Sequence, residues 1–366
     1  MADLKELGGT LRKRLSDDGY WNLPGRADPD PQYDKLFYGG GYPITGIEKF
    51  LGYFDSVLNI ANFPSISLTA DYSSAHCYCR YLKKPGQDLV MLDGKMDQSY
   101  TRRSNKALSF FKSLFSLTGS FQFYIERKRN YESAKGLGES AAIAAACARA
   151  IYRCVFSQDP EKNQPLVSRF ARLVSGSGTR SIAGGISLWL SYPYMKEPES
   201  YAVRVSDGQK FSVGFIPVRA DVRTENMHSL AAESPFYNVW SGIKFNRIFD
   251  LLDQRFPDSL LMRISEVDMF LMHSLLLSRG IYLHTSESLS IIERMISIRR
   301  RMPEFFFTSD TGPSLVFFSA DHKLISELSN ESGYNIQSAK VMTNEPPEDP
   351  QIRKKAEAAM EKYGTF

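Results

Sequence analysis

Residues 175–185 combine side chains and backbone types suited to holding an anion. The segment reads SGSGTRSIAGG and brings hydroxyl groups, one guanidinium (Arg180) and four glycines into eleven residues. Hydroxyls and backbone N–H groups can surround an anion, and an arginine can bind a carboxylate or phosphate through two parallel hydrogen bonds. A glycine-rich turn leading into a strand has the same composition, so this segment alone leaves both interpretations open.

Residues 135–150 (KGLGESAAIAAACARA) predict a glycine loop that opens onto a helix. The alanine run is a strong helix former, and Gly136 and Gly138 supply the turn before it. Free N–H groups and the positive end of the helix dipole attract anions at such an N-terminus. A glycine turn that only caps the helix is the alternative.

One carboxylate lies in a third segment, residues 304–319 (EFFFTSDTGPSLVFFS). Its two apolar runs predict a strand, a turn and a second strand, with Asp310 in the turn. A carboxylate in a turn ordinarily accepts hydrogen bonds from its own backbone. The pattern by itself therefore gives Asp310 no chemical role.

The whole chain has the size and composition of a two-domain globular protein. It has 366 residues, 43% of them hydrophobic, and lacks a run of about 18 apolar residues that would predict a membrane span. A net charge of +4 is too small to indicate nucleic-acid binding but suits an anionic small molecule. The N-terminus resembles neither a signal nor a transit peptide, which predicts a cytoplasmic protein without a membrane partner. Four cysteines without zinc spacing indicate reduced thiols and no metal site.

Strands and helices must alternate to position these segments. Residues 1–40 are polar and rich in Asp, Pro and Gly, which predicts an irregular leader. Alternating and helical patterns predict strands within 44–96, 121–125 and 186–220, and helices within 101–118 and 236–302. Asp93-Gly94 predicts a hairpin turn. A domain boundary is expected between residues 197 and 198.

Together the three segments resemble the diphosphomevalonate decarboxylase family of the GHMP kinase superfamily. The resemblance covers residues 41–320 in the same order. The family's serine- and arginine-containing segment is matched by VSGSGTRS (residues 174–181), and its Asp-Ala-Gly-Pro-Asn turn by DTGPS (310–314). Its lysine-containing segment is matched by GIEKFLGYFD (46–55), and its Gly-Met-Arg…Thr-Ser-Pro segment by NMHSLAAESP (226–235).

This resemblance implies an α+β protein with the GHMP kinase fold. We expect a ribosomal-protein-S5-like N-terminal domain (residues 41–197) and a ferredoxin-like C-terminal domain (198–366), with the active site in the cleft between them. Family members are commonly dimers, which predicts a homodimer. In the family, a kinase-like step phosphorylates the 3-hydroxyl of a phosphorylated mevalonate, and this phosphate then leaves as the carboxylate loses CO2.

The resemblance also implies roles for single residues. Asp310 matches the family's central carboxylate, Lys49 its neighbouring ammonium and Arg180 the guanidinium that holds the substrate carboxylate. The candidate substrate-binding residues are Ser175, Ser177, Arg223, His228, Ser140 and Thr311.

Glu139 departs from the family, because it replaces the first serine of the phosphate loop. A carboxylate about 4 Å from a phosphate oxygen costs about 4 kcal/mol at an effective dielectric constant near 20, whereas the helix end returns only about 0.3–1 kcal/mol. We therefore expect ATP to bind poorly unless Mg²⁺ or Lys135 intervenes. A Glu139 that only caps the helix is the alternative.

The groups that hold the 5-diphosphate in the family are replaced as well. Its Tyr and second Lys are Phe50 and Tyr53 here, and its Arg is His228, while Arg223 stands in place of a serine. The loss of one Lys and one Arg predicts a monophosphate at C5. Arg223, Arg127 or Arg129 is then available for a phosphate already present on the 3-oxygen.

These departures predict an ATP-independent enzyme that needs no cofactor and resembles the archaeal mevalonate 3,5-bisphosphate decarboxylases. It would form isopentenyl phosphate, CO2 and phosphate, with Asp310 acting electrostatically rather than as a base. One alternative is an ATP-dependent decarboxylase of mevalonate 5-phosphate or 5-diphosphate in which Glu139 binds Mg²⁺. Others are a mevalonate 3-kinase and a non-catalytic binding protein of the same fold, although a binding role would not need Lys49, Arg180 and Asp310 together.

Overall fold

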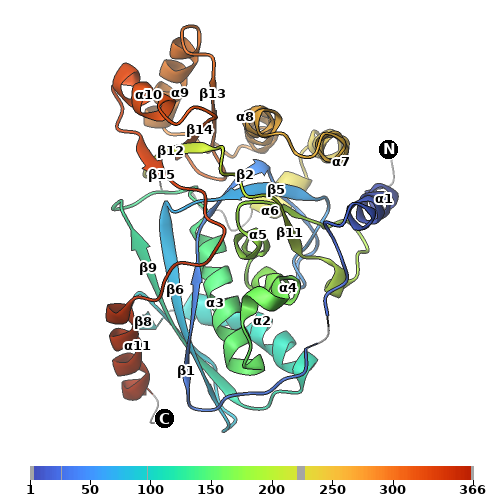
Figure 1. The fold of residues 1–366 in the computed structure, drawn as a ribbon, viewed down its shortest axis with the longest axis vertical. Coiled ribbons are helices and arrows are strands. Elements are labelled where there is room, and N and C mark those ends of the chain that lie inside the picture. The colour runs from blue at the N-terminus through green and yellow to red at the C-terminus, as the bar shows by residue number, and fades with distance from the viewer. Residues whose placement is uncertain (1–3, 26, 97, 221–226, 364–366) are drawn as a thin grey trace.

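The computed structural model describes residues 4–25, 27–96, 98–220 and 227–363, and strands and helices are mixed along the chain (Figure 1). The strands are β1 (Leu36–Gly41), β2 (Ile44–Glu48), β3 (Tyr53–Asp55), β4 (Ile60–Ala61), β5 (Ser65–Thr69), β6 (Ser73–Leu82), β7 (Leu89–Leu92), β8 (Lys95–Met96), β9 (Ser120–Arg129), β10 (Ile186–Trp189), β11 (Ala202–Ser206), β12 (Ser212–Ile216), β13 (Phe305–Thr308), β14 (Leu315–Ser319) and β15 (Gln337–Ala339). The helices are α1 (Leu4–Asp17), α2 (Gln98–Phe115), α3 (Glu139–Phe156), α4 (Gln164–Val174), α5 (Gly178–Ala183), α6 (Met227–Ala232), α7 (Tyr237–Asp253), α8 (Asp258–Leu277), α9 (Ser286–Arg299), α10 (Leu324–Ser332) and α11 (Pro350–Tyr363). Short 3₁₀ turns lie at Pro160–Asn163 and Glu197–Glu199.

The first sheet has the strand order β1-β6-β9-β7-β8 and is covered on both faces. Side chains alternate along β6, so Cys77 and Cys79 join the core beneath α3, whereas Tyr78 packs on the other face with Ile352 of α11. Figure 1 shows α3 and α11 on opposite sides of this sheet. The four cysteines are free, and the β7–β8 pairing confirms the predicted hairpin.

The second sheet, β11-β10-β5-β2, shares a core with α1, α7 and α8. The expected irregular leader is wrong for Leu4–Asp17, which form α1 because Leu11 and Leu15 repeat at helical spacing and are fully buried. The expected boundary between residues 197 and 198 falls between β10 and β11, two strands that pair with each other. This sheet therefore continues across that point.

The third sheet, β13-β14-β12-β15, packs against α9 and α10. Antiparallel pairing of Phe305–Thr308 with Leu315–Ser319 confirms the predicted strand, turn and strand around Asp310. None of the helices in the described ranges is by itself long and apolar enough to cross a membrane, although Glu139–Phe156 and Pro160–Val174, bent by 97°, would qualify together by length and composition.

Candidate active site

A cavity of about 690 Å³ lies where the glycine loop, the end of β2, α5 and the Asp310 turn meet. It brings together every predicted site residue that the structure describes. These are Lys49, Ser140, Ser175, Ser177, Arg180, His228, Asp310 and Thr311. The remaining predicted residue, Arg223, lies outside the described residues.

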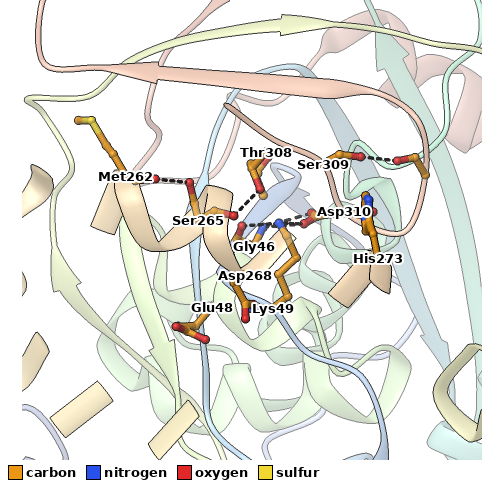
Figure 2. A network of polar contacts seen from close by, with 12 residues as sticks. Gly46, Glu48, Lys49, Met262, Ser265, Asp268, His273, Thr308, Ser309 and Asp310 are labelled. Atoms are coloured by element: carbon orange, nitrogen blue, oxygen red, sulfur yellow. Dashed lines mark hydrogen bonds and ion pairs between the residues drawn. The ribbon is translucent and has the colours of Figure 1, made fainter. Parts of the chain in front are cut away.

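A buried ion pair stands at one wall of the cavity. Lys49 Nζ lies 2.7 Å from Asp310 Oδ1, and the Gly46 N–H lies 3.1 Å from both carboxylate oxygens (Figure 2). Lys49 also donates to the Gly46 carbonyl at 2.8 Å. The Lys49 side chain is only 2% exposed, whereas Asp310 is 21% exposed and faces the cavity. The carboxylate thus bonds across to β2 and not, as a turn carboxylate ordinarily does, to its own turn.

A second polar network fixes the backbone of Lys49 from behind. Its N–H donates to Asp268 on α8 at 2.7 Å. Lys244 on α7 donates to both Asp268 and Glu48, and these three side chains are fully buried. Burial first, and the nearby Asp268 second, raise the pKa of Glu48 to about 7, while Lys244 and Arg247 oppose that rise. The network joins α7 and α8 to the end of β2 and so sets where Lys49 lies.

Helix α8 also holds the Asp310 turn. Thr308 donates to the Ser265 carbonyl at 2.9 Å, and His273 Nε2 lies 3.0 Å from the Asp310 carbonyl oxygen. Figure 2 shows Asp268 and His273 reaching from this helix toward Lys49 and Asp310 respectively. One helix therefore places both members of the ion pair.

Arg180 presents a positive charge with spare hydrogen-bonding capacity. It lies on α5, is 3% exposed, and its Nε has no hydrogen-bond partner within the described part of the chain. Burial lowers the pKa of Arg180 to about 10, against the opposing effect of Asp310. Its guanidinium carbon is 5.8 Å from the centre of the Trp189 ring. A buried guanidinium in the cavity wall is suited to binding a carboxylate.

Ser175 and Ser177 precede Arg180 at the turn between α4 and α5. Their hydroxyl groups lie 2.9 Å apart and line the cavity. The glycine-rich segment is therefore not a simple turn into a strand: a six-residue helix, α5, separates the serines from β10.

The glycine loop packs tightly between β2 and the Asp310 turn. A Cβ atom on Gly136 would lie 2.9 Å from Gly312 Cα, and one on Gly138 would lie 2.1 Å from the Ile44 carbonyl oxygen. Both glycines also have positive φ angles, 88° and 67°. The loop thus supports the turn that carries Asp310 as well as opening onto α3.

Glu139, at the start of α3, is bonded by three side chains from β9 and the loop after it. Arg129 donates to both of its carboxylate oxygens, Tyr131 donates at 2.9 Å, and Arg127 lies 3.4 Å away. We call Glu139, Arg127, Arg129 and Tyr131 the Glu139 cluster. The expected repulsion of about 4 kcal/mol assumed an unpaired carboxylate. That premise is wrong, because Arg129 pairs with Glu139 directly and Arg127, which also pairs with Asp93, lies close to it.

One part of the cavity wall is aromatic, and its only neighbouring positive charge named among the described residues is Arg180. The His228 ring lies 4.5 Å from that of Tyr53 and 4.9 Å from that of Phe50. His228 Nδ1 accepts the Gly52 N–H at 3.1 Å, and burial lowers the pKa of His228 to about 4, so the ring is neutral. Burial also raises the pKa of Tyr53 to about 12.

Sequence reasoning missed several residues that hold the site. Asp268 and His273 lie on a helix whose pattern indicates only core packing, and Glu48 and Lys244 carry no motif. Their partners are 24 to 219 residues away along the chain. No local periodicity could have signalled these contacts.

Comparison with known proteins agrees with this architecture. A family described as "Diphosphomevalonate decarboxylase-like N-terminal domain" matches residues 42–202. Mevalonate 3,5-bisphosphate decarboxylase from Thermoplasma acidophilum is 40% identical over 329 residues, which cover 90% of this chain and 81% of that protein.

Two solved structures share the fold at low sequence identity. Mevalonate diphosphate decarboxylase from Staphylococcus aureus is 18% identical, with a TM-score of 0.71 over 85% of this chain and 98% of that one. Mevalonate-3-kinase from Thermoplasma acidophilum is 16% identical, with a TM-score of 0.68 over 87% and 100%. The fold is thus the GHMP kinase fold, as expected from the resemblance. On these matches, the chain belongs to the diphosphomevalonate decarboxylase family.

Proposed function

We propose that this protein decarboxylates mevalonate 3,5-bisphosphate to isopentenyl phosphate, CO2 and phosphate without ATP. The observation that carries the proposal is the Lys49–Asp310 ion pair, which faces the same cavity as the Arg180 guanidinium. The 40% identity to an enzyme named for this substrate supports it.

The reaction needs a held carboxylate and a stabilised positive charge. Arg180 binds the substrate carboxylate, which keeps C1 in place. The C3–O bond breaks, and its electron pair leaves with the phosphate. Positive charge that develops at C3 is stabilised by the Asp310 carboxylate, which Lys49 and Gly46 hold in one orientation. The C1–C2 electron pair then forms the C2=C3 double bond, and CO2 departs. No hydroxyl proton has to be removed, so Asp310 acts through its charge.

The Glu139 cluster supports the absence of a nucleotide step. In a phosphate loop that opens onto a helix, the anion approaches the first turn of that helix. Here the Glu139 carboxylate occupies that turn, bonded to Arg129 and Tyr131. A triphosphate would have to displace these contacts. In this proposal ATP is excluded because the Glu139 cluster already occupies the first turn of α3, and not because Glu139 carries an unpaired negative charge.

The aromatic part of the cavity wall supports a 5-monophosphate over a 5-diphosphate, because Arg180 beside it already binds the substrate carboxylate in this proposal. Phe50, Tyr53 and His228 contribute no positive charge there. The extra charge of a diphosphate would enter a largely desolvated region without a counter-ion from these residues. Mevalonate 3-phosphate 5-diphosphate should accordingly be the poorer substrate.

The test supplies mevalonate 3,5-bisphosphate to protein freed of nucleotide by apyrase and EDTA. We expect stoichiometric CO2, phosphate and isopentenyl phosphate, measured by ¹⁴CO2 trapping and mass spectrometry. Parallel reactions contain mevalonate 5-phosphate or 5-diphosphate with MgATP. CO2 release that requires ATP would establish the ATP-dependent alternative, and a 3-phosphorylated product without CO2 would establish a kinase.

We also propose that the enzyme works as a homodimer in the cytoplasm. The proposal rests on the family resemblance, since dimers are common among its members. Light scattering of the purified protein tests the assembly, measured at several protein concentrations because association depends on concentration. A mass of one chain would contradict it.

A further inference from the structure

A pair of histidines lies behind the Asp310 turn and outside the proposed chemistry. His273 Nε2 is 3.0 Å from the Asp310 carbonyl oxygen, and His273 Nδ1 is 2.8 Å from His284 Nε2. His284 Nδ1 is in turn 3.2 Å from the Ser288 hydroxyl in the first turn of α9. The three side chains form a continuous path from α9 to the backbone of Asp310.

The hydrogen positions on the two histidine rings follow from the Asp310 carbonyl, which is one end of this path. A carbonyl oxygen only accepts, so His273 Nε2 must carry a hydrogen. Burial lowers the pKa of His273 to about 3 and also lowers the pKa of His284, so both rings are neutral at pH 7. His273 Nδ1 is then a bare acceptor, and His284 Nε2 must donate to it. Only one pair of tautomers satisfies both contacts.

The start of α9 holds His284 in place. Ser288 closes a capping box with Thr285, in which each side chain bonds the other residue's N–H. The Ser288 hydroxyl lies 3.2 Å from His284 Nδ1, which the tautomer leaves as an acceptor, and 3.1 Å from the Thr285 carbonyl, so these two acceptors share its one hydrogen. His284 is therefore oriented by a helix end and not by the cavity.

Asp310 is consequently held from both of its ends. Its carboxylate bonds to Lys49 and Gly46, and its carbonyl bonds to His273. Asp268, which holds the Lys49 backbone, precedes His273 by five residues on α8, or about 7.5 Å of helix rise. Asp268 holds Lys49 and His273 holds Asp310, and both belong to one helix. The helix therefore sets the position of Lys49 relative to Asp310.

We propose that His273, in the Nε2–H tautomer that the Asp310 carbonyl requires and His284 supports, is a positioning residue that aims the Asp310 carboxylate at the reacting carbon. It touches no substrate atom and acts through the Asp310 peptide. The inference rests on the proposed function, because electrostatic stabilisation of a developing charge depends on groups fixed before the reaction. Displacement of such a group by 1 Å can cost about 100-fold in rate.

The experiment compares His273→Leu with His273→Gln in the CO2-release assay. Leucine removes the donor to Asp310, and we expect kcat to fall about 10- to 100-fold while KM changes less. The glutamine amide can restore an N–H near the position of Nε2, and we expect it to recover most of kcat. His76→Leu is the matched control, since His76 on β6 contacts Tyr38 of β1 and Ser74 of its own strand and does not line the cavity. We expect it to lower Tm without lowering kcat.

A double variant tests whether the two histidines act in series. His284→Leu should lower kcat less than His273→Leu. It removes the partner that supports the His273 tautomer, but His273 itself can still donate to the Asp310 carbonyl. The combined variant should be no slower than His273→Leu, whereas independent packing losses would add. Additive losses, or equal kcat values for His273→Leu and the wild type, overturn the proposal.

A measurement without substrate separates this inference from the proposed function. Ring ¹⁵N–¹H correlation spectra of the wild-type protein report tautomers directly, and we expect His273 as the Nε2–H form at pH 7. If that tautomer is found but no CO2 is released by the wild type, the function is wrong and the histidine arrangement stands. If CO2 is released and His273 is the Nδ1–H form, the inference is wrong and the function stands.

Discussion

Replacement of Asp310 by Asn removes one charge while keeping the shape of the side chain. A full charge about 4 Å from a developing positive centre contributes about 4 kcal/mol at an effective dielectric constant near 20. Each 1.36 kcal/mol changes the rate about tenfold, so kcat should fall about 1,000-fold. The amide oxygen can still accept the Gly46 N–H, which limits the change to charge.

The same substitution leaves a lysine without its counter-ion. Lys49 is 2% exposed and would keep the Gly46 carbonyl and the new amide oxygen as acceptors, but no opposite charge. Breaking a buried pair costs about 3–5 kcal/mol, and the 21% exposure of Asp310 places this case at the lower end. Asp310→Asn should therefore lower Tm, and adding Lys49→Met should recover part of Tm without recovering kcat.

The assay measures ¹⁴CO2 from carboxyl-labelled mevalonate 3,5-bisphosphate in nucleotide-free buffer, beside thermal unfolding of each variant. The wild-type protein and the single variant Lys49→Met complete a double-mutant cycle with Asp310→Asn and the double variant. The reasoning is refuted if Asp310→Asn keeps kcat within about tenfold of the wild type. It is equally refuted if the double variant regains activity together with stability.

Three other substitutions test separate parts of the structure. Arg180→Lys cannot bind a carboxylate through two parallel hydrogen bonds. At about 1.5–3 kcal/mol per charged hydrogen bond, kcat/KM should fall by about 10- to 100-fold. An unchanged value in the CO2 assay would contradict the assigned role. Glu139→Gln weakens the contacts of Arg129 and should tighten MgATP binding in calorimetry, whereas equal affinity would show that the Glu139 cluster does not exclude nucleotide. The pKa of Glu48 is raised from 4.5 to about 7, so its contribution to stability is full below pH 4.5 and lost as pH rises through 7. Between pH 5 and 8 the wild type should lose up to about 3 kcal/mol more unfolding free energy than Glu48→Gln, and parallel pH profiles of Tm would contradict this.

The sequence predicts those parts of the site that depend on local patterns. Asp93-Gly94 marks a hairpin because only certain residues accept its backbone angles, and the apolar runs around Asp310 mark two strands. The alanine-rich run forms α3 as expected. Each of these signals is complete within about 20 residues, which is the range over which periodicity can be detected.

Long-range pairing accounts for what the sequence could not predict. Glu139 looks like an unpaired charge along the chain, and only the fold brings Arg129 and Tyr131 to it. Likewise, nothing near His273 indicates that it bonds a carbonyl 37 residues later. Helix α5 was missed because it is only six residues long and lies between glycines.

One face of the first sheet is covered by α11, the last helix of the described chain. The outer face of β6, β7 and β9 carries Tyr78, Met91 and Tyr124, and α11 covers these side chains with Ile352 and other apolar residues. During synthesis this face stays bare until residue 363 has emerged, although the strands themselves are made more than 230 residues earlier. An unfinished chain therefore exposes a strip of tyrosine and methionine to other nascent chains.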